Sequence, residues 1–422
     1  MALAEVQACL DSGYDINLRV GPVGRVPLHW AAQRNQDPQV IEAMLRSGAK
    51  INIRDGNGLT PLHLAAMKNP ELQVAEMLLA AGAEVDARSS KNMMQTPLHW
   101  AVFQNPEPAV MEALLAAGAN PNSINAHGYT PLHMAAWMSP DPAVIEMLLD
   151  AGARINVRDV HGGTTPLHAA ALANPEPAVI EALLKAGVKI NSREKMGGTP
   201  LHYATNNDNP QIAQALINAG ARVNESDNYG LSTLHWAAMY STAGIVEKLL
   251  AAGAEIDSRG PGAATALHLA SNCNSEPVVK TLLAGGAKAN SHDQQGWSPL
   301  HWAVGEPEPA VMNKLLQSGK TLSKNSSDKK TEPFQDRKCT ARTDIIEALL
   351  QAGAQVDNRA QDGKTPLHVA IVNSNSRAIM ALLDGGADPN SADNSNKTAW
   401  DYIQENPGLQ NTDAYNRLKN SQ

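Results

Sequence analysis

The stretch TPLHLAAMKNPELQVAEMLLAAGA, residues 60–83, decides the fold, because versions of it recur along the whole chain. Successive motif histidines from His29 to His301 are 33 to 36 residues apart. A period in this range predicts a stacked array of helical repeats around one continuous core, rather than two or three separate globular domains. Close copies of Thr-Pro-Leu-His stand at 60–63, 96–99, 130–133, 165–168, 199–202 and 365–368, with looser copies at 26–29, 232–235, 265–268 and 298–301.

Residues 58–90 predict two helices joined by tight turns. Thr60 is suited to the N-cap of the first helix, and the proline after it suits the first helical position. Leucine and alanine at helical spacing then form an apolar stripe that faces inward. Asn69 and Pro70 separate this helix from a second apolar helix, which ends at Gly82. The polar turn that follows is a candidate hairpin arm leading to the next repeat.

The pattern resembles the ankyrin repeat family. The motif TPLHxAA, an apolar second helix and an ending of the LLxxGAxxN type, as in residues 114–122 and 148–156, cover the chain from about residue 3 to residue 403. Second helices that open with Asn-Pro-Glu-Pro, at 105–108 and 174–177, are similar to a variant associated with bacterial members. The resemblance implies an all-α repeat solenoid of helix-turn-helix units with β-hairpin fingers, in a curved, elongated stack. It also implies that the concave groove and the finger tips bind other proteins.

The chain is expected to form one array with three irregular parts. Because no first helix precedes residues 3–13, the first repeat should expose apolar surface; we favour a truncated or misassigned start, and a covering partner is the alternative. Lysines, arginines and serines replace core residues in 320–342, which indicates a degenerate, mobile repeat or else a hinge or basic docking segment. The expected parts are a partial repeat with only its second helix at 1–17, nine regular repeats at 18–319, a degenerate basic repeat at 320–358, a regular repeat at 359–396 and a C-terminal cap at 397–422.

Composition narrows the function classes. The formal net charge of −8 and the pI of about 5.9 disfavour nucleic-acid binding. No apolar run approaches the ~20 residues of a membrane span, and no signal peptide is visible. Three cysteines without CxxC spacing argue against disulfides and zinc and suit a reducing compartment. We therefore expect a cytoplasmic and monomeric protein without cofactors, although a secreted effector is compatible with the sequence.

The histidines are the residues that most invite a catalytic interpretation. Ten of the 13 belong to the repeated motif, where each is expected to bond the start of its helix to the neighbouring loop. His127, His161 and His292 fall in predicted finger tips, and the first two lie on adjacent fingers. A shared metal there is conceivable, but solvated loop histidines are the favoured interpretation. Because HExxH, GxSxG and phosphate-binding loops are also absent from the sequence, we expect no enzyme, no catalytic residue and no metal site.

The resemblance to ankyrin arrays implies that residues four and five places after each motif histidine face the concave groove, where a partner is expected. Several of these positions are apolar although an exposed helix face is normally polar, which is typical of an interface. Bulky residues there can alternatively pack on one another across the inner helix layer. The candidate binding residues are Met67, Phe103, Trp137, Met138, Leu172, Met239 and Tyr240 on helices, and Met93, Met94 and Tyr129 on fingers.

Two further positions border this face. Residues directly after the motif histidine, such as Trp100 and Trp236, are expected to pack between repeats. The finger position before the motif, occupied by Tyr129, Leu231 and Trp297, is expected to have little cover. The sequence therefore favours a non-enzymatic protein-binding scaffold. Alternatives are an inhibitor or immunity-type protein that occludes an enzyme, and the targeting module of a larger toxin or effector.

Overall fold

A computed structural model describes residues 3–91, 93–105, 107–273, 276–305 and 343–421. Every regular element in these ranges is a helix, and the only β-type pairings among them are two isolated bridges, Val20 with Arg25 and Ser226 with Ser232. The predicted all-α repeat solenoid is confirmed. The chain divides into two compact units, an N-terminal unit (Met1–Ser192) and a C-terminal unit (Arg193–Gln422).

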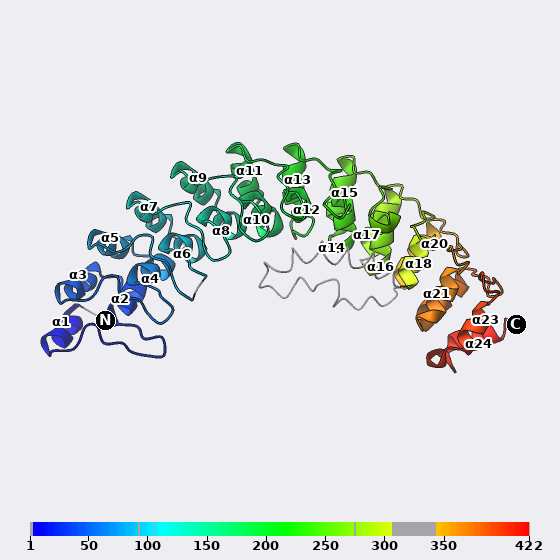
Figure 1. Cartoon of the computed structure of the whole chain (residues 1–422), viewed down its shortest axis with the longest axis horizontal. Coiled ribbons are helices and arrows are strands. Elements are labelled where there is room, and N and C mark those ends of the chain that lie inside the picture. Colours follow the sequence, from blue (N-terminus) through cyan, green and yellow to red (C-terminus); the bar gives the residue numbers. More distant parts are fainter. Residues whose placement is uncertain (1–2, 92, 106, 274–275, 306–342, 422) are drawn as a thin grey trace. The chain divides into compact units, whose positions relative to one another are not determined.

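The N-terminal unit consists of two rows of short helices, and most of these helices pack on the next helix of the same row (Figure 1). One row holds the first helix of each repeat: α2 (Pro27–Arg34), α4 (Pro61–Lys68), α6 (Pro97–Gln104), α8 (Pro131–Met138) and α10 (Pro166–Ala173). The other row holds the second helices: α1 (Leu3–Asp11), α3 (Pro38–Arg46), α5 (Leu72–Ala80), α7 (Pro108–Ala116), α9 (Pro142–Asp150) and α11 (Pro177–Lys185).

The C-terminal unit repeats the same arrangement. Its first helices are α12 (Pro200–Ala204), α14 (Thr233–Tyr240), α16 (Ala266–Cys273), α18 (Pro299–Val304), α21 (Pro366–Val372) and α23 (Ala399–Gln404). Its second helices are α13 (Pro210–Asn218), α15 (Ala243–Ala251), α17 (Glu276–Ala284), α20 (Thr343–Gln351), α22 (Ser376–Asp384) and α24 (Asp413–Lys419). Two short 3₁₀ helices, η1 (Pro261–Ala263) and η2 (Pro407–Leu409), lie in the connections.

Helix boundaries follow the local chemistry of the motif. Thr60 is the N-cap of α4, and its side chain accepts the His63 N–H. Pro61 follows at the first position, where its missing N–H costs no helical hydrogen bond. Gly82, just after α5, has a φ of +87°, a left-handed conformation that glycine adopts without a steric penalty. The predicted start and stop signals of the repeat are confirmed.

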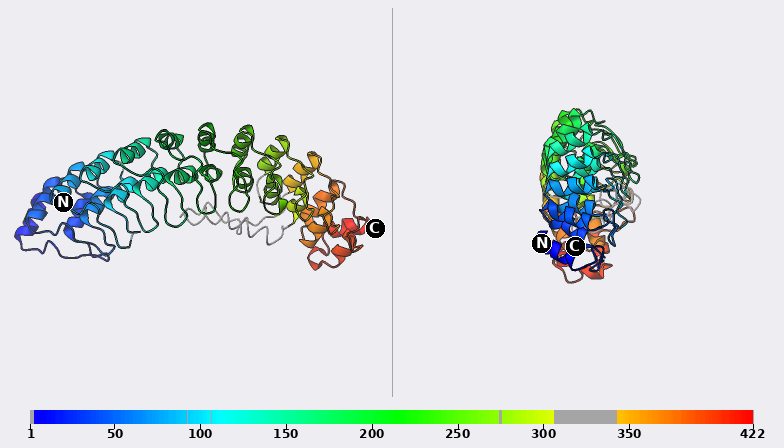
Figure 2. Two further views of the ribbon diagram at one scale, coloured as in Figure 1. Left: turned by 45° about the horizontal axis from the view of Figure 1, so that its top comes forward. Right: turned by 90° about the vertical axis from the view of Figure 1, so that its left-hand side faces the viewer.

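The fingers are turns rather than paired strands (Figure 2). In the second finger, the Asp55 N–H donates to Leu59 O (2.9 Å), and Asp55 Oδ1 accepts the N–H groups of Asn57 and Leu59. The Ser90 N–H of the next finger donates to Asn57 O (3.1 Å). The hydrogen bond between Asp55 and Leu59 closes a short turn. Too few residues remain in it for the paired strands of a β-hairpin. An aspartate or another polar side chain holds many of the described fingers in this way, whereas Val20, Gly260 and Ala360 take its place in three of them.

The first helices on either side of the predicted degenerate repeat contact each other directly. His301 Nε2 lies 3.1 Å from Lys364 O, the contact that other motif histidines make to the next repeat. α18 packs on both α20 and α21. α20, which the sequence assigns to a separate repeat at 320–358, packs on α17 and α22 in the row of second helices and also on α18. The predicted boundary after 18–319 and the basic stretch lie at 306–342, outside the described residues.

Candidate protein-binding surface

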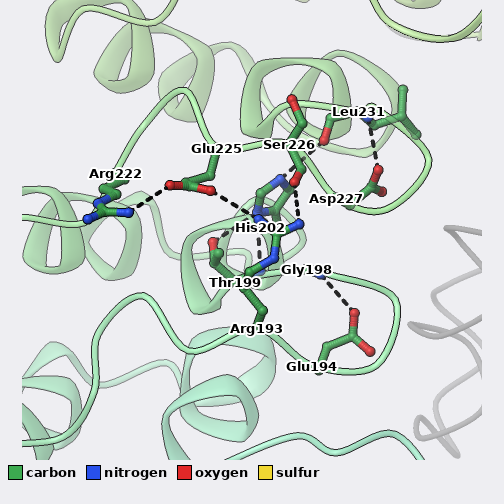
Figure 3. Close-up of polar contacts among 10 residues, drawn as sticks. All are labelled: Arg193, Glu194, Gly198, Thr199, His202, Arg222, Glu225, Ser226, Asp227 and Leu231. Carbon is green, nitrogen blue, oxygen red and sulfur yellow. Dashed lines mark hydrogen bonds and ion pairs between the residues drawn. The ribbon is translucent and has the colours of Figure 1, made fainter.

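The motif histidines are structural parts of the repeat, as Figure 3 shows for His202. The Thr199 N–H donates to His202 Nδ1 (3.2 Å), and the Thr199 hydroxyl oxygen is 2.8 Å from the same atom. His202 Nε2 is 3.3 Å from Leu231 O, in the next finger. Because Nδ1 accepts a backbone N–H, the ring proton resides on Nε2 and is donated to that carbonyl. The predicted link between a helix start and the neighbouring loop is confirmed.

Burial keeps these histidines neutral. It lowers the pKa of His202 to about 4, and the hydrogen bond to the Leu231 carbonyl offsets only part of that effect. A neutral imidazole can make both hydrogen bonds at once, whereas a protonated ring has no acceptor for the Thr199 N–H. The pKa is lowered to about 4 by burial in the same way for His63, His99, His133, His235, His268 and His301.

Two of the finger histidines lie close together. The rings of His127 and His161 are close, with centroids 5.7 Å apart in an edge-to-face arrangement. In the described ranges, no three histidine, cysteine or acidic side chains are grouped so that they could hold a metal ion. Beside His202, Glu225 pairs with Arg193 (3.0 Å) and Arg222 (3.1 Å), which joins neighbouring loops (Figure 3).

Three of the predicted binding residues of the N-terminal unit lie on α6 and α8, which pack side by side. Phe103, near the end of α6, is half-buried, and its ring centroid is 5.9 Å from that of Trp100. Trp100 packs in turn against Met67, which is only 8% exposed and belongs to a core cluster with Leu59 and Leu64. Met67 therefore supports the surface from below instead of forming it.

A second aromatic group lies on α8 and the finger before it. The rings of Tyr129 and Trp137 are edge-to-face with centroids 6.4 Å apart, and both side chains are half-buried. Burial raises the pKa of the Tyr129 hydroxyl to about 12, so this group remains neutral. Met138 follows Trp137 and is 46% exposed. Leu172, at the corresponding position of α10, is half-buried.

The finger that carries Met93 and Met94 borders this surface. Their side chains are 51% and 43% exposed, and both residues adopt left-handed backbone conformations, with φ of 57° and 56°. Met93 O accepts the Ala126 N–H (2.6 Å), which connects this finger to the one that leads to Tyr129. The two-residue insertion therefore presents two flexible apolar side chains next to the aromatic residues.

The candidates of the C-terminal unit differ. Met239 is fully buried in α14, so it is unavailable to a partner in this conformation. Tyr240 is half-buried. The expectation that Leu231 has little cover is wrong: its side chain is fully buried, and Asp227 Oδ1 accepts its backbone N–H. The position of a residue in the repeat is therefore not enough to predict whether its side chain is buried or exposed.

The packing predicted for residues directly after the motif histidine is confirmed in the C-terminal unit. Trp236 is 1% exposed and stands edge-to-face on His202, with centroids 5.3 Å apart. Its indole N–H donates to Asp227 Oδ2 (3.0 Å), and Trp302 does the same to Asp293 (2.8 Å). These aspartates were not among the residues predicted from the sequence. Their signal was an aspartate nine residues before each of the two tryptophans.

Several partly exposed aromatic and sulfur-containing side chains lie on two adjacent repeats and their fingers, and we take them as one candidate surface. We call it the aromatic surface: Trp100, Phe103, Tyr129, Trp137 and Met138, bordered by Met93 and Met94.

Comparison with known proteins identifies the class. The family described as "Ankyrin repeats (3 copies)" matches residues 3–89, 88–159, 104–194, 167–260, 234–328 and 337–411. The chain therefore belongs to the ankyrin repeat family, and repeats of this kind point to a protein–protein interaction module.

Curated relatives match over short segments. Human BCL-6 corepressor-like protein 1 is 51% identical over 57 residues, which is 14% of this chain and 3% of that protein. The Caenorhabditis elegans "Ankyrin repeat and LEM domain-containing protein 1 homolog" is 40% identical over 67 residues, 16% of this chain and 10% of that protein. Human "Protein fem-1 homolog A" is 34% identical over 61 residues, 14% and 9% respectively. In the described part of the chain, no helix has the length and apolar character that crossing a membrane requires.

Proposed function

We propose that this chain is a non-enzymatic scaffold that binds a partner protein through the aromatic surface of its N-terminal unit. The observation that carries the proposal is the accumulation of partly exposed aromatic and methionine side chains on α6, α8 and their fingers. Partly exposed aromatic residues supply large apolar contact area and dominate the energetics of many interfaces. An inhibitor that occludes an enzyme would use the same surface.

Rigid support favours tight binding at this place. Trp100 is packed on the Met67 cluster, and Tyr129 lies edge-to-face with Trp137. Side chains that are already held in position lose little conformational entropy when a partner binds. The bordering methionines add an adaptable edge, because their unbranched side chains can fit different contours.

The test is affinity purification of the full chain with quantitative mass spectrometry, comparing the wild type with a Phe103→Ala/Trp137→Ala variant. We expect at least a tenfold loss of the specific partner. The matched control is Val372→Ala, because Val372 is four residues after its motif histidine, like Phe103 and Trp137, and is 55% exposed in the C-terminal unit. The control should retain the partner. Equal retention by both variants would contradict the proposed site, and loss of folding in the double variant would assign the two rings to the core.

A further inference from the structure

The exposed methionines of this chain gather at the aromatic surface. Among the methionines that the structure describes, three side chains are exposed: Met93 (51%), Met94 (43%) and Met138 (46%). Met93 and Met94 lie in the turn of the third finger, and Met138 is the last residue of α8. The other described methionines are half-buried or buried, and Met67 in α4 and Met134 in α8 are 8% and 5% exposed. The most accessible methionine side chains therefore lie on the surface that we propose for partner binding.

A solvent-exposed thioether reacts with peroxides. The lone pair of Sδ attacks one oxygen of hydrogen peroxide, an S–O bond forms as the O–O bond breaks, and hydroxide leaves. The hydroxide takes the proton of the new S–OH group, so the products are a sulfoxide and water. Sulfur loses two electrons in this step, and the peroxide gains them. Methionine sulfoxide reductases reverse the change with two thiols, which become a disulfide while the oxygen leaves as water.

Burial protects the remaining methionines from this reaction. Met239 is fully buried in α14, and Met67 packs in a core cluster with Leu59 and Leu64. A peroxide reaches such a sulfur only when the repeat opens, and the resulting sulfoxide would place a polar oxygen among apolar side chains. An exposed sulfoxide keeps its contact with water. Oxidation therefore falls on the three exposed methionines before it reaches the core.

The third finger keeps its backbone bonds when its methionines are oxidised. The Ser89 N–H donates to Gln95 O (3.0 Å), and the Gln95 N–H donates to Ser89 Oγ (3.1 Å), which closes the finger at its base. Met93 O accepts the Ala126 N–H of the next finger (2.6 Å). These bonds are made by main-chain groups and by Ser89, so the methionine sulfurs take no part in them. Oxidation thus changes the chemistry of the surface without removing the bonds that hold it in place.

From this arrangement we infer that Met93, Met94 and Met138 form a reversible oxidation site, and that sulfoxide formation there releases the partner from the aromatic surface. The inference rests on the proposed function. A thioether adds adaptable apolar contact area at the edge of the aromatic surface. A sulfoxide oxygen is a hydrogen-bond acceptor, and an apolar partner surface that covers it removes its water without supplying a donor. Binding is therefore weaker in the oxidised state.

Peptide mapping by mass spectrometry tests the site without a partner. The folded full chain is titrated with hydrogen peroxide, and the oxidised fraction of each methionine is followed over time. We expect the three exposed methionines to oxidise about tenfold faster than Met67, Met134 and Met239, and this difference to vanish in urea. Methionine sulfoxide reductases of both stereochemical classes, supplied with a thiol, should restore the three thioethers. Equal rates at exposed and buried methionines of the folded chain would overturn the inference.

Partner capture tests the consequence of oxidation. The partner set is defined as the proteins that the wild type retains and Phe103→Ala/Trp137→Ala loses, and the peroxide is removed before the chain meets the lysate. We expect the oxidised wild type to retain about tenfold less of this set, and reductase treatment to restore it. A Met93→Leu/Met94→Leu/Met138→Leu variant keeps apolar side chains of similar volume without sulfur. It should retain the partner set with and without peroxide.

A matched control variant replaces three half-buried methionines. Met77→Leu/Met147→Leu/Met380→Leu removes the same number of sulfurs from second helices, and it should remain as sensitive to peroxide as the wild type. The exposed thiol of Cys9 is present in both leucine variants, so its oxidation cancels in their comparison.

Failure of the oxidation site and failure of the proposed function give different results. If the oxidised wild type keeps the partner set, or the oxidised Met93→Leu/Met94→Leu/Met138→Leu variant loses as much of it as the wild type does, the inference is wrong and the proposed function stands. A lower urea midpoint of the oxidised wild type would also overturn the inference, because partner loss would then follow from unfolding. If Phe103→Ala/Trp137→Ala retains every partner, the proposed function fails and the oxidation site fails with it.

Discussion

Trp100 and Trp236 occupy the same motif position in the two units of the molecule but have different surroundings. Trp236 is buried on His202, and its indole N–H is bonded to Asp227. Trp100 is half-buried, and its indole nitrogen has no hydrogen-bond partner among the described residues. Ser89 takes the place of the aspartate in the longer third finger. The comparison teaches that the finger, rather than the motif, decides whether an aromatic residue becomes core or surface.

Acidification should have the largest effect on folding stability. Both units should respond to it, because both contain buried motif histidines. Seven buried motif histidines, among them His133 and His202, have pKa values of about 4 in the folded state, against 6.5 in the unfolded chain. The unfolded chain therefore binds more protons between these values, so stability is complete above pH 6.5 and is lost as the pH falls toward 4. One pKa unit corresponds to about 1.4 kcal/mol per histidine, so we expect a loss of several kcal/mol in total.

Urea unfolding between pH 7 and pH 4.5 measures this loss. A His235→Gln variant should be less stable at pH 7 but have a shallower pH dependence, since one buried titrating group is removed. A urea midpoint that stays constant from pH 6.5 to pH 4.5 would contradict the buried, neutral state of the histidines. Imidazole chemical shifts followed by NMR would report the same titration directly.

Trp236→Ala should have the next largest effect. Removing a fully buried indole leaves a cavity and an unpaired Asp227 oxygen, and we expect a loss of about 3–5 kcal/mol in the free energy of unfolding. Trp100→Ala removes a half-buried ring with no hydrogen bond, so we expect roughly half that loss or less. Urea unfolding of the two variants side by side measures the difference. Equal losses would mean that Trp100 is as much a part of the core as Trp236.

Much of the fold was predictable because its determinants are local and repeated. The Thr-Pro start and the glycine stop of each helix depend on neighbouring residues only, and the copies reinforce one another. The histidine bonds were predictable for the same reason. The contact of His301 with Lys364 was not predictable, because the two residues are 63 positions apart and no local signal indicates it.

The candidate site was predictable only in part. Phe103, Trp137 and Met138 were singled out by their register and do retain exposed surface, but Met239 has the same register and none. The difference depends on how neighbouring repeats and fingers cover each side chain, which a one-dimensional period does not encode. Trp100 was assigned to packing, yet its finger lacks the aspartate that completes such packing elsewhere.

Asp227→Ala tests the role of the finger directly. Asp227 Oδ1 accepts the N–H groups of Tyr229 and Leu231, and Oδ2 accepts the Trp236 indole N–H, so its loss leaves three donors unpaired. We expect a cost of about 2–3 kcal/mol in urea unfolding. The reverse change, Ser89→Asp, should give Trp100 an acceptor and stabilise the chain by about 1 kcal/mol. If Ser89→Asp has no effect on stability, the finger does not control Trp100.

The smallest effect is expected from the backbone of the same finger. Met93 and Met94 adopt left-handed conformations that cost a non-glycine residue about 1 kcal/mol each, whereas Gly58 occupies such a conformation in the preceding finger without this penalty. Met94→Gly should therefore raise the free energy of unfolding by up to about 1 kcal/mol, while partner binding weakens because an exposed side chain is lost. Met94→Leu is the control, since it keeps both the strain and an apolar side chain. Backbone strain that is retained at two exposed residues is typical of a functional position. If Met94→Gly raises the stability without weakening partner binding, this finger does not belong to the proposed surface, and the aromatic residues of α6 and α8 bind the partner alone.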